Sequence, residues 1–203
     1  MATSGTRTAV LEATVRLIAT GGLQAVSHRA VEAAAGVSHG TTRYYFGSRQ
    51  KIVDATLEYL AARDAAMADQ ARQAAVATPA PDGFDIDRVA NLMVALVTGE
   101  QHYQLARYEL MLEVARRPEL RPSLARWRMS FIARIEAMLT QLGAPNPDLA
   151  ARWWVAAMDG LLLDELCAGT LSFPEHATPL IRAMLATAAN IPSASSPDSA
   201  RPT

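Results

Sequence analysis

The chain has 203 residues, of which 50% are hydrophobic and 19% are charged, and its formal net charge is −1. This length suffices for one domain, or for a small domain joined to a larger one, with a sizeable apolar core. The single cysteine, Cys167, excludes an intrachain disulfide and any metal site built from several cysteines. No signal sequence and no apolar stretch of membrane-spanning length is recognisable, so we expect a cytoplasmic protein with no membrane partner.

The first fifty residues predict a compact unit of short helices. Apolar residues recur at helical spacing over about residues 6–20, and two glycines end this helix. Ser27 can cap a second helix, whose buried face is expected to hold Ala30, Val31 and Ala34. Gly36 can end this second helix, because glycine accepts left-handed backbone without steric cost.

A tight turn then leads into a third helix, which Ser38 can cap and which ends near Phe46. Val37 and Phe46 are expected to pack inside the unit. Ser48 can cap a fourth helix that runs to about residue 75. Two short helices joined by a tight turn are typical of a helix-turn-helix, which binds DNA. Residues 1–52 hold six basic and two acidic side chains, which favours contact with phosphates despite the net charge of the whole chain.

The rest of the chain predicts further helices and no strands. A loop is expected over residues 78–83, where two prolines and a glycine fall within six residues. The expected helices cover residues 85–97, 101–116, 122–142, 148–168 and 174–189. Residues 191–203 are rich in proline and serine and are expected to form a disordered tail. We therefore predict an all-α protein, with an N-terminal three-helix helix-turn-helix unit and a larger C-terminal helical bundle.

The segment AGVSHGTTRYYFGSR, residues 35–49, resembles the TetR family of transcriptional regulators, whose usual pattern is A-G-V-S-x-G-x-x-Y-x-x-F-x-S-K. Two positions depart from this pattern. Arg43 stands where the family usually has a phosphate-contacting tyrosine, and Arg49 replaces a lysine; both keep a hydrogen-bond donor. The resemblance implies a DNA-binding domain over residues 1–50, a ligand-binding and dimerisation domain over residues 51–190, and the tail over 191–203.

The resemblance also implies two sets of DNA-contacting residues. Residues expected to face the groove are Arg29, His39, Gly40, Thr41, Thr42 and Tyr44. Residues expected to clamp the DNA backbone are Ser27, His28, Ser38, Arg43, Tyr45, Arg49 and Lys51. Hydroxyls and cationic groups bond phosphates and base edges, while threonine methyls and aromatic faces meet thymine methyls.

A candidate ligand pocket combines polar-tipped and soft apolar side chains, a mixture typical of pockets between bundle helices. Its candidate residues are Tyr103, Arg107, Tyr108, Met111, Trp127 and Phe131. Ordinary core packing is the alternative interpretation of the same residues.

The last two long helices are apolar over more than one face, which predicts burial on two sides. In the TetR family this helix pair forms a four-helix dimer interface. The candidate interface residues are Trp154, Met158, Leu161, Leu162, Leu180 and Met184; packing within one bulky core is the alternative. A two-fold dimer would present paired recognition helices to a palindromic site.

No catalytic residue, metal ligand or cofactor is predicted. Glu109 and Glu113 share a helical face, but neither His102 nor His176 completes the Glu-x-x-His step of a di-iron bundle. Cys167 lies in no recognisable nucleophile arrangement. We therefore expect no enzyme.

Together these features predict a homodimeric, ligand-responsive transcriptional regulator that binds a double-stranded DNA operator. Repression relieved by a small-molecule effector of unknown identity is the favoured interpretation. An activator of the same family, or a helical ligand-binding protein with a vestigial helix-turn-helix, remains an alternative.

Overall fold

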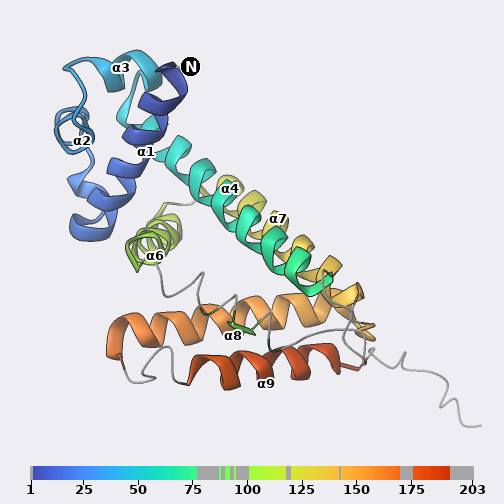
Figure 1. Cartoon of the computed structure of the whole chain (residues 1–203). Coiled ribbons are helices and arrows are strands. Elements are labelled where there is room, and N and C mark those ends of the chain that lie inside the picture. The colour runs from blue at the N-terminus through green and yellow to red at the C-terminus, as the bar shows by residue number, and fades with distance from the viewer. Residues whose placement is uncertain are drawn as a thin grey trace, which may run out of the picture. The chain divides into compact units, whose positions relative to one another are not determined.

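In the computed structural model, the regular structure of the described residues is entirely helical (Figure 1). The structure describes residues 2–76, 101–117, 120–141, 143–169 and 176–192, together with Asp87, Ala90, Asn91 and Val94. The elements are α1 (Ala2–Gly21), η1 (Leu23–Ala25), α2 (His28–Ala35), α3 (Thr41–Phe46), α4 (Arg49–Val76), α6 (Gln101–Arg116), α7 (Arg121–Gln141), α8 (Pro147–Ala168) and α9 (Ala177–Ala189). This confirms the predicted all-α fold with an N-terminal helix-turn-helix.

The helices belong to two compact units. The first comprises residues 1–69 and 95–131, and the second comprises residues 70–94 and 132–203. In the first unit α1 packs against both α2 and α6. The core of this unit joins fully buried residues of α1, such as Leu11 and Ile18, to Ile52 of α4 and Leu110 of α6. The compact units therefore divide the chain differently from the predicted domain boundary at residue 50, because α1 and α6 share one core.

Local capping fixes α2 as the sequence predicts. The Ser27 hydroxyl accepts a hydrogen bond from the Ala30 amide at 3.1 Å, and Gly36 ends the helix with φ 65°. Val31 is fully buried as expected. The prediction for Ala34 is wrong, because Ala34 is exposed, while the charged Glu32 is only 5% exposed.

The third helix starts later than the sequence suggests. It begins at Thr41 after Gly40, which adopts left-handed backbone with φ 89°. Ser38 therefore does not cap it, and the Ser38 hydroxyl instead contacts the Thr41 hydroxyl at 3.0 Å. At the next junction the prediction holds, since the Ser48 hydroxyl accepts from the Lys51 amide at the start of α4.

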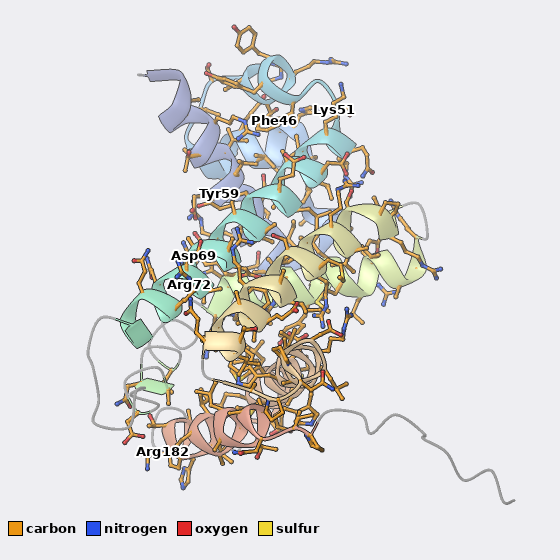
Figure 2. The ribbon with its side chains drawn as sticks, turned by 90° about the vertical axis from the view of Figure 1, so that its right-hand side faces the viewer. Phe46, Lys51, Tyr59, Asp69, Arg72 and Arg182 are labelled. Carbon is orange, nitrogen blue, oxygen red and sulfur yellow. The ribbon has the colours of Figure 1, made fainter. Side chains whose placement is uncertain are left out.

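In the second unit α8 and α9 pack against each other and run antiparallel (Figure 1). The Asn146 side chain caps α8 by accepting from the Leu149 amide, and its amide group donates to the Pro192 carbonyl beyond the end of α9. Arg182 of α9 (labelled in Figure 2) forms an ion pair with Asp87. The first contact links the start of α8 to the chain after α9, and the ion pair links α9 to residue 87; Ile181 of α9 is fully buried.

The later helices match the predicted ranges to within a few residues at each end. Of the predicted helix over 85–97, the four described residues are helical. The predicted loop over 78–83 and nearly all of the predicted tail lie outside the described residues. In the part of the chain that is described, no helix is long and apolar enough to cross a membrane.

Candidate nucleic-acid interface

The α3 helix and the turn before it present a polar, cationic surface. Tyr44 is the most exposed large aromatic residue described, at 83%, and its ring packs edge-on against Tyr45 with centroids 5.1 Å apart. Arg43 and His39 are also exposed, and Gly40 and Thr41 are half-buried. This surface offers hydrogen-bond donors and an aromatic edge at the scale of a DNA groove.

Further predicted contact residues flank α3. Arg29 on α2 and Lys51 in the first turn of α4 are exposed, whereas Tyr45 is half-buried. Figure 2 shows Lys51 at the end of α4 that adjoins Phe46, the buried last residue of α3. Ser27 and Ser38 are exposed, but each hydroxyl already has an intrachain partner. The Ser27 hydroxyl accepts its bond and keeps its own proton to donate, so the phosphate contacts of these two serines stay a prediction.

Thr42 does not belong to the exposed surface. Its side chain is fully buried, and its hydroxyl donates to Glu32 Oε1 at 2.6 Å. His28 Nδ1 lies 2.8 Å from the same hydroxyl. Because Thr42 is buried, its side chain does not lie on the surface that would face the groove. It instead links α2 and α3 through its hydroxyl.

Arg49 also faces inward. Its guanidinium donates to the Val26 carbonyl at 2.7 Å and to the Leu23 carbonyl at 2.5 Å. These bonds join Arg49 to the first residue of η1 and to the residue that follows η1, in the segment that leads into α2. Arg49 is thus an internal anchor, and the phosphate contact predicted for it does not fit this geometry.

A second polar cluster joins α1, α4 and α6 within the first unit. Glu12 of α1 accepts hydrogen bonds from the hydroxyls of Tyr59 and Tyr103, with Tyr103 Oη at 2.6 Å from Oε1 and 2.5 Å from Oε2. Figure 2 shows Tyr59 about two turns along α4 from Lys51. The Arg63 guanidinium lies over the Tyr103 ring, 3.8 Å from its centroid. One carboxylate therefore ties α1 to α4 and α6.

The same cluster shifts the acidity of its members. Burial alone would raise the pKa of Glu12, but the hydrogen bonds from Tyr103 and Tyr59, with the charges of Arg63 and Arg16, lower it below its ordinary value. Burial and the bond to Glu12 raise the pKa of Tyr103. Glu12 is therefore held ionised and Tyr103 is held as a proton donor.

The predicted ligand-binding residues all lie in the first unit, on α6 and α7. Tyr103 and Arg107 line a cavity of about 10 Å³ together with residues of α4. Arg107 pairs with Asp64 at 3.7 Å and donates to Tyr108 Oη at 3.0 Å, while Trp127 Nε1 donates to Asp64 at 3.1 Å. Met111 and Phe131 are half-buried. The cavity has room for roughly one water molecule.

A short α2, a turn and an exposed α3, all held on one core, define a helix-turn-helix DNA-binding protein. Family models confirm and sharpen this class: residues 84–189 match the tetracyclin repressor-like C-terminal domain, and residues 10–56 match the bacterial regulatory proteins of the tetR family. The chain belongs to the TetR family of transcriptional regulators, with an N-terminal DNA-binding and a C-terminal ligand-binding domain. No curated protein matches it.

Solved structures share this fold over nearly the whole chain. The multidrug binding protein EbrR complexed with ethidium is 26% identical, covers 90% of this chain and 98% of its own, and gives a TM-score of 0.66. A TetR-family member from Streptomyces coelicolor A3 is also 26% identical, with 90% and 97% covered and a TM-score of 0.68. A putative TetR-family regulator from Rhodococcus sp. is 23% identical, with 92% and 100% covered and a TM-score of 0.71.

The sequence interpretation missed the buried Glu32, the half-buried Glu12 and the carboxylate of Asp64. The signal for Glu32 is its position on the inner face of an otherwise alanine-rich helix. For Glu12 the only signal is a carboxylate within an apolar helical stripe. Among the described residues, no group of three or more His, Cys, Asp or Glu side chains is placed to hold a metal ion.

Proposed function

We propose that this TetR-family regulator is a repressor that binds a palindromic operator as a homodimer and leaves it when a small molecule binds. Residues 1–50 form its DNA-binding domain and residues 51–190 its ligand-binding and dimerisation domain. The operator contacts come from the exposed α3 surface and its flanks. These contact residues are Arg29, His39, Gly40, Thr41, Arg43, Tyr44 and Lys51, with support from His28 and Tyr45.

The proposed ligand response rests on one observation. Tyr103 lines the small cavity beside Gln104 and Arg107, and its hydroxyl is bonded to Glu12 on α1, the helix on which the helix-turn-helix packs. A group that enters the cavity must therefore move a residue that is bonded directly to the DNA-binding part. A response of about 100-fold in operator affinity needs roughly 2.7 kcal/mol of differential ligand binding.

The cavity must open before it can hold an effector. Ligand pockets usually span about 300–1,000 Å³, far more than the space between Tyr103 and Arg107. The Gln104 Oε1 atom is buried without a hydrogen-bond partner and could accept one from a ligand. Asp64 supplies a carboxylate at the same wall. Since EbrR binds ethidium, we choose this planar aromatic cation as the first probe.

A dimer is supported by apolar side chains that α8 and α9 leave exposed. Leu149, Trp153 and Leu163 follow one helical stripe of α8, and Leu180 lies on α9. Their exposures lie between 37% and 48%, which is unusual for such large apolar residues on neighbouring helices. A second copy of the chain would cover this surface in a two-fold arrangement.

The exposed apolar residues of α8 and α9 differ from the interface residues that the sequence predicts. Trp154, Met158 and Leu162 are each at most 6% exposed in the single chain, so they are core residues and offer little surface to a partner. The other predicted residues, Leu161 and Met184, are half-buried, and Leu180 is exposed. The interface that we propose therefore centres on Leu149, Trp153, Leu163 and Leu180.

The test combines operator selection with ligand release. The purified full chain is used to select duplexes from a randomised DNA library, and binding is then measured by fluorescence anisotropy with and without ethidium. We expect a palindromic consensus, two protomers per duplex, and affinity for the selected duplex at least 1,000-fold above that for scrambled DNA. Failure to select any consensus would refute operator binding. If a consensus is found but no small molecule changes the affinity for it, the chain binds an operator and the proposed ligand response is refuted.

A further inference from the structure

The recognition helix α3 receives its N-terminal cap from another helix. No side chain at the start of α3 caps it, and Gly40 at the cap position has none to offer. Instead Glu32 of α2 reaches across, and its Oε1 accepts from the amides of Gly40 and Thr42, each at 3.0 Å. The amide of Thr41 donates to the Ser38 carbonyl, whereas the amides of Gly40 and Thr42 depend on Glu32.

Glu32 is well suited to this task. It is 5% exposed, and the same oxygen also accepts from the Thr42 hydroxyl at 2.6 Å. Hydrogen bonds to a carboxylate are shorter and stronger than bonds to a neutral acceptor, and a negative charge is favourable at the start of a helix. The bond from the Thr42 hydroxyl and those from the two amides keep the pKa of Glu32 below its ordinary value, so the carboxylate is ionised at neutral pH.

The network extends to the first residue of α2. Because the Thr42 hydroxyl donates its only proton to Glu32, its oxygen is left to accept from His28 Nδ1–H at 2.8 Å. This fixes the ring of His28 and the position of its proton. A single carboxylate thus sets the start of α3 and, through Thr42, the side chain at the start of α2.

We infer that Glu32 is a positioning residue for sequence-specific DNA reading, which holds α3 at the angle and register that present Arg43 and Tyr44 to base edges. Glu32 itself does not touch DNA, because it is buried behind α3. Its role differs from that of a phosphate contact, since phosphate contacts support specific and non-specific binding alike. A positioning residue instead increases the difference between the affinity for the operator and the affinity for non-specific DNA.

Because Glu32 is negatively charged, the direction in which the Kd for DNA changes in a variant tests the inference. Removing a negative charge from beneath a DNA-binding surface strengthens attraction to phosphates, so electrostatics alone predicts tighter binding by a variant. Loss of positioning predicts weaker binding to the operator only. The two effects therefore have opposite directions in the same measurement.

The experiment compares Glu32→Ala and Glu32→Gln in the full-length protein. Each variant is titrated with the selected operator and with a scrambled duplex of the same length and salt concentration. For Glu32→Ala we expect the operator Kd to rise by about 10-fold or more, with the scrambled Kd unchanged or lower. Glu32→Gln keeps an amide oxygen that can accept the same bonds, so we expect it to stay within about threefold of the wild type.

Two further variants complete the test. Glu58→Ala removes an exposed carboxylate on α4 and is the matched control for charge; it should leave the ratio of the two Kd values unchanged. Thr42→Val keeps the shape and removes only the hydroxyl. It should raise the ratio of operator Kd to scrambled-DNA Kd about threefold or more, and it decides the case if circular dichroism shows that Glu32→Ala is unfolded.

One result would overturn the inference: an unchanged ratio of operator Kd to scrambled-DNA Kd in folded Glu32→Ala, whether both affinities stay the same or both weaken equally. The inference rests on the proposed operator function. If the wild-type chain binds the operator and the scrambled duplex equally, that function has failed, and this measurement is made before any variant is tested.

Discussion

The bond between Tyr103 and Glu12 predicts a measurable coupling between α6 and α1. Tyr103→Phe removes one hydroxyl and leaves the ring, with its contact to Arg63, in place. A hydrogen bond to a charged group contributes about 1.5–3 kcal/mol. Because Glu12 keeps its bond from Tyr59, we expect the lower part of this range, about 1.5–2 kcal/mol. In a protein of this size, that loss lowers the melting temperature by about 3–8 °C.

The assay is thermal unfolding followed by circular dichroism, together with amide hydrogen exchange in α1 and α6. Tyr45→Phe is the matched control. Tyr45 is a half-buried tyrosine in the same unit, and its hydroxyl makes no hydrogen bond within the described part of the chain. We expect this control to change stability by less than about 0.5 kcal/mol. Faster exchange in Tyr103→Phe should appear in α1 as well as in α6, since the lost bond joins both helices.

A double-mutant cycle measures the coupling energy between Glu12 and Tyr103. Glu12→Ala, which removes the acceptor, and Tyr103→Phe are measured singly and together, and contacting residues of this kind show coupling energies of about 0.5–3 kcal/mol. We expect coupling of about 1 kcal/mol or more. Strict additivity of the two substitutions, or a stability of Tyr103→Phe equal to that of the wild type, would refute the argument that this bond ties α6 to α1.

Three other predictions follow from the described contacts. Since the pKa of Glu12 is lowered in the fold, its contribution to stability is full above its ordinary value of 4.5 and is lost as pH falls through the folded value; acid titration of Tyr103→Phe should show a smaller loss. Trp153→Glu should convert the dimer to monomer in sedimentation at micromolar concentration, while Arg152→Ala, beside it on exposed α8 surface, should not. Arg49→Lys should lower stability by about 1–3 kcal/mol in thermal unfolding, because an ammonium group cannot span two carbonyls as the guanidinium does.

Features set by neighbouring residues were predictable from the sequence. The caps of Ser27 and Ser48 act on amides three residues away, and Gly36 ends α2 by its own backbone freedom. Helix periodicity likewise placed α6 at the predicted residues. Each of these features depends on a stretch of sequence no longer than the helix itself.

The cap of α3 was not predictable in this way. Ser38 has the expected residue type at the expected offset, yet the cap comes from Glu32, eight residues before Gly40. Because Gly40 takes the cap position before Thr41, Ser38 lies two residues ahead of that position, and its hydroxyl contacts the Thr41 hydroxyl instead of an amide of α3. The choice between the two caps depends on how α2 lies against α3, which no local pattern encodes.

The surface that we propose for dimerisation was likewise not predictable from a local pattern. Trp153 and Trp154 are adjacent on an apolar helix, so composition alone cannot decide which one faces inward. In the fold Trp154 is 1% exposed and Trp153 is 38% exposed. The rotation of α8 about its axis, which its packing partners set, decides this difference.

Glu32 and Glu12 act on different parts of the first unit, and this separation restricts how an effector can act. Glu32 accepts hydrogen bonds from Gly40 and Thr42 at the start of α3, whereas Glu12 accepts them from tyrosines of α4 and α6. A ligand that displaces Tyr103 therefore breaks the tie at Glu12 and leaves the cap of α3 intact. We expect the helix-turn-helix to move as one body, with the spacing of the two α3 helices in the dimer changed and each helix still folded. Unchanged exchange of the Gly40 and Thr42 amides on effector binding, beside altered exchange in α1 and α6, is the signature of this mechanism; melting of α3 would contradict it.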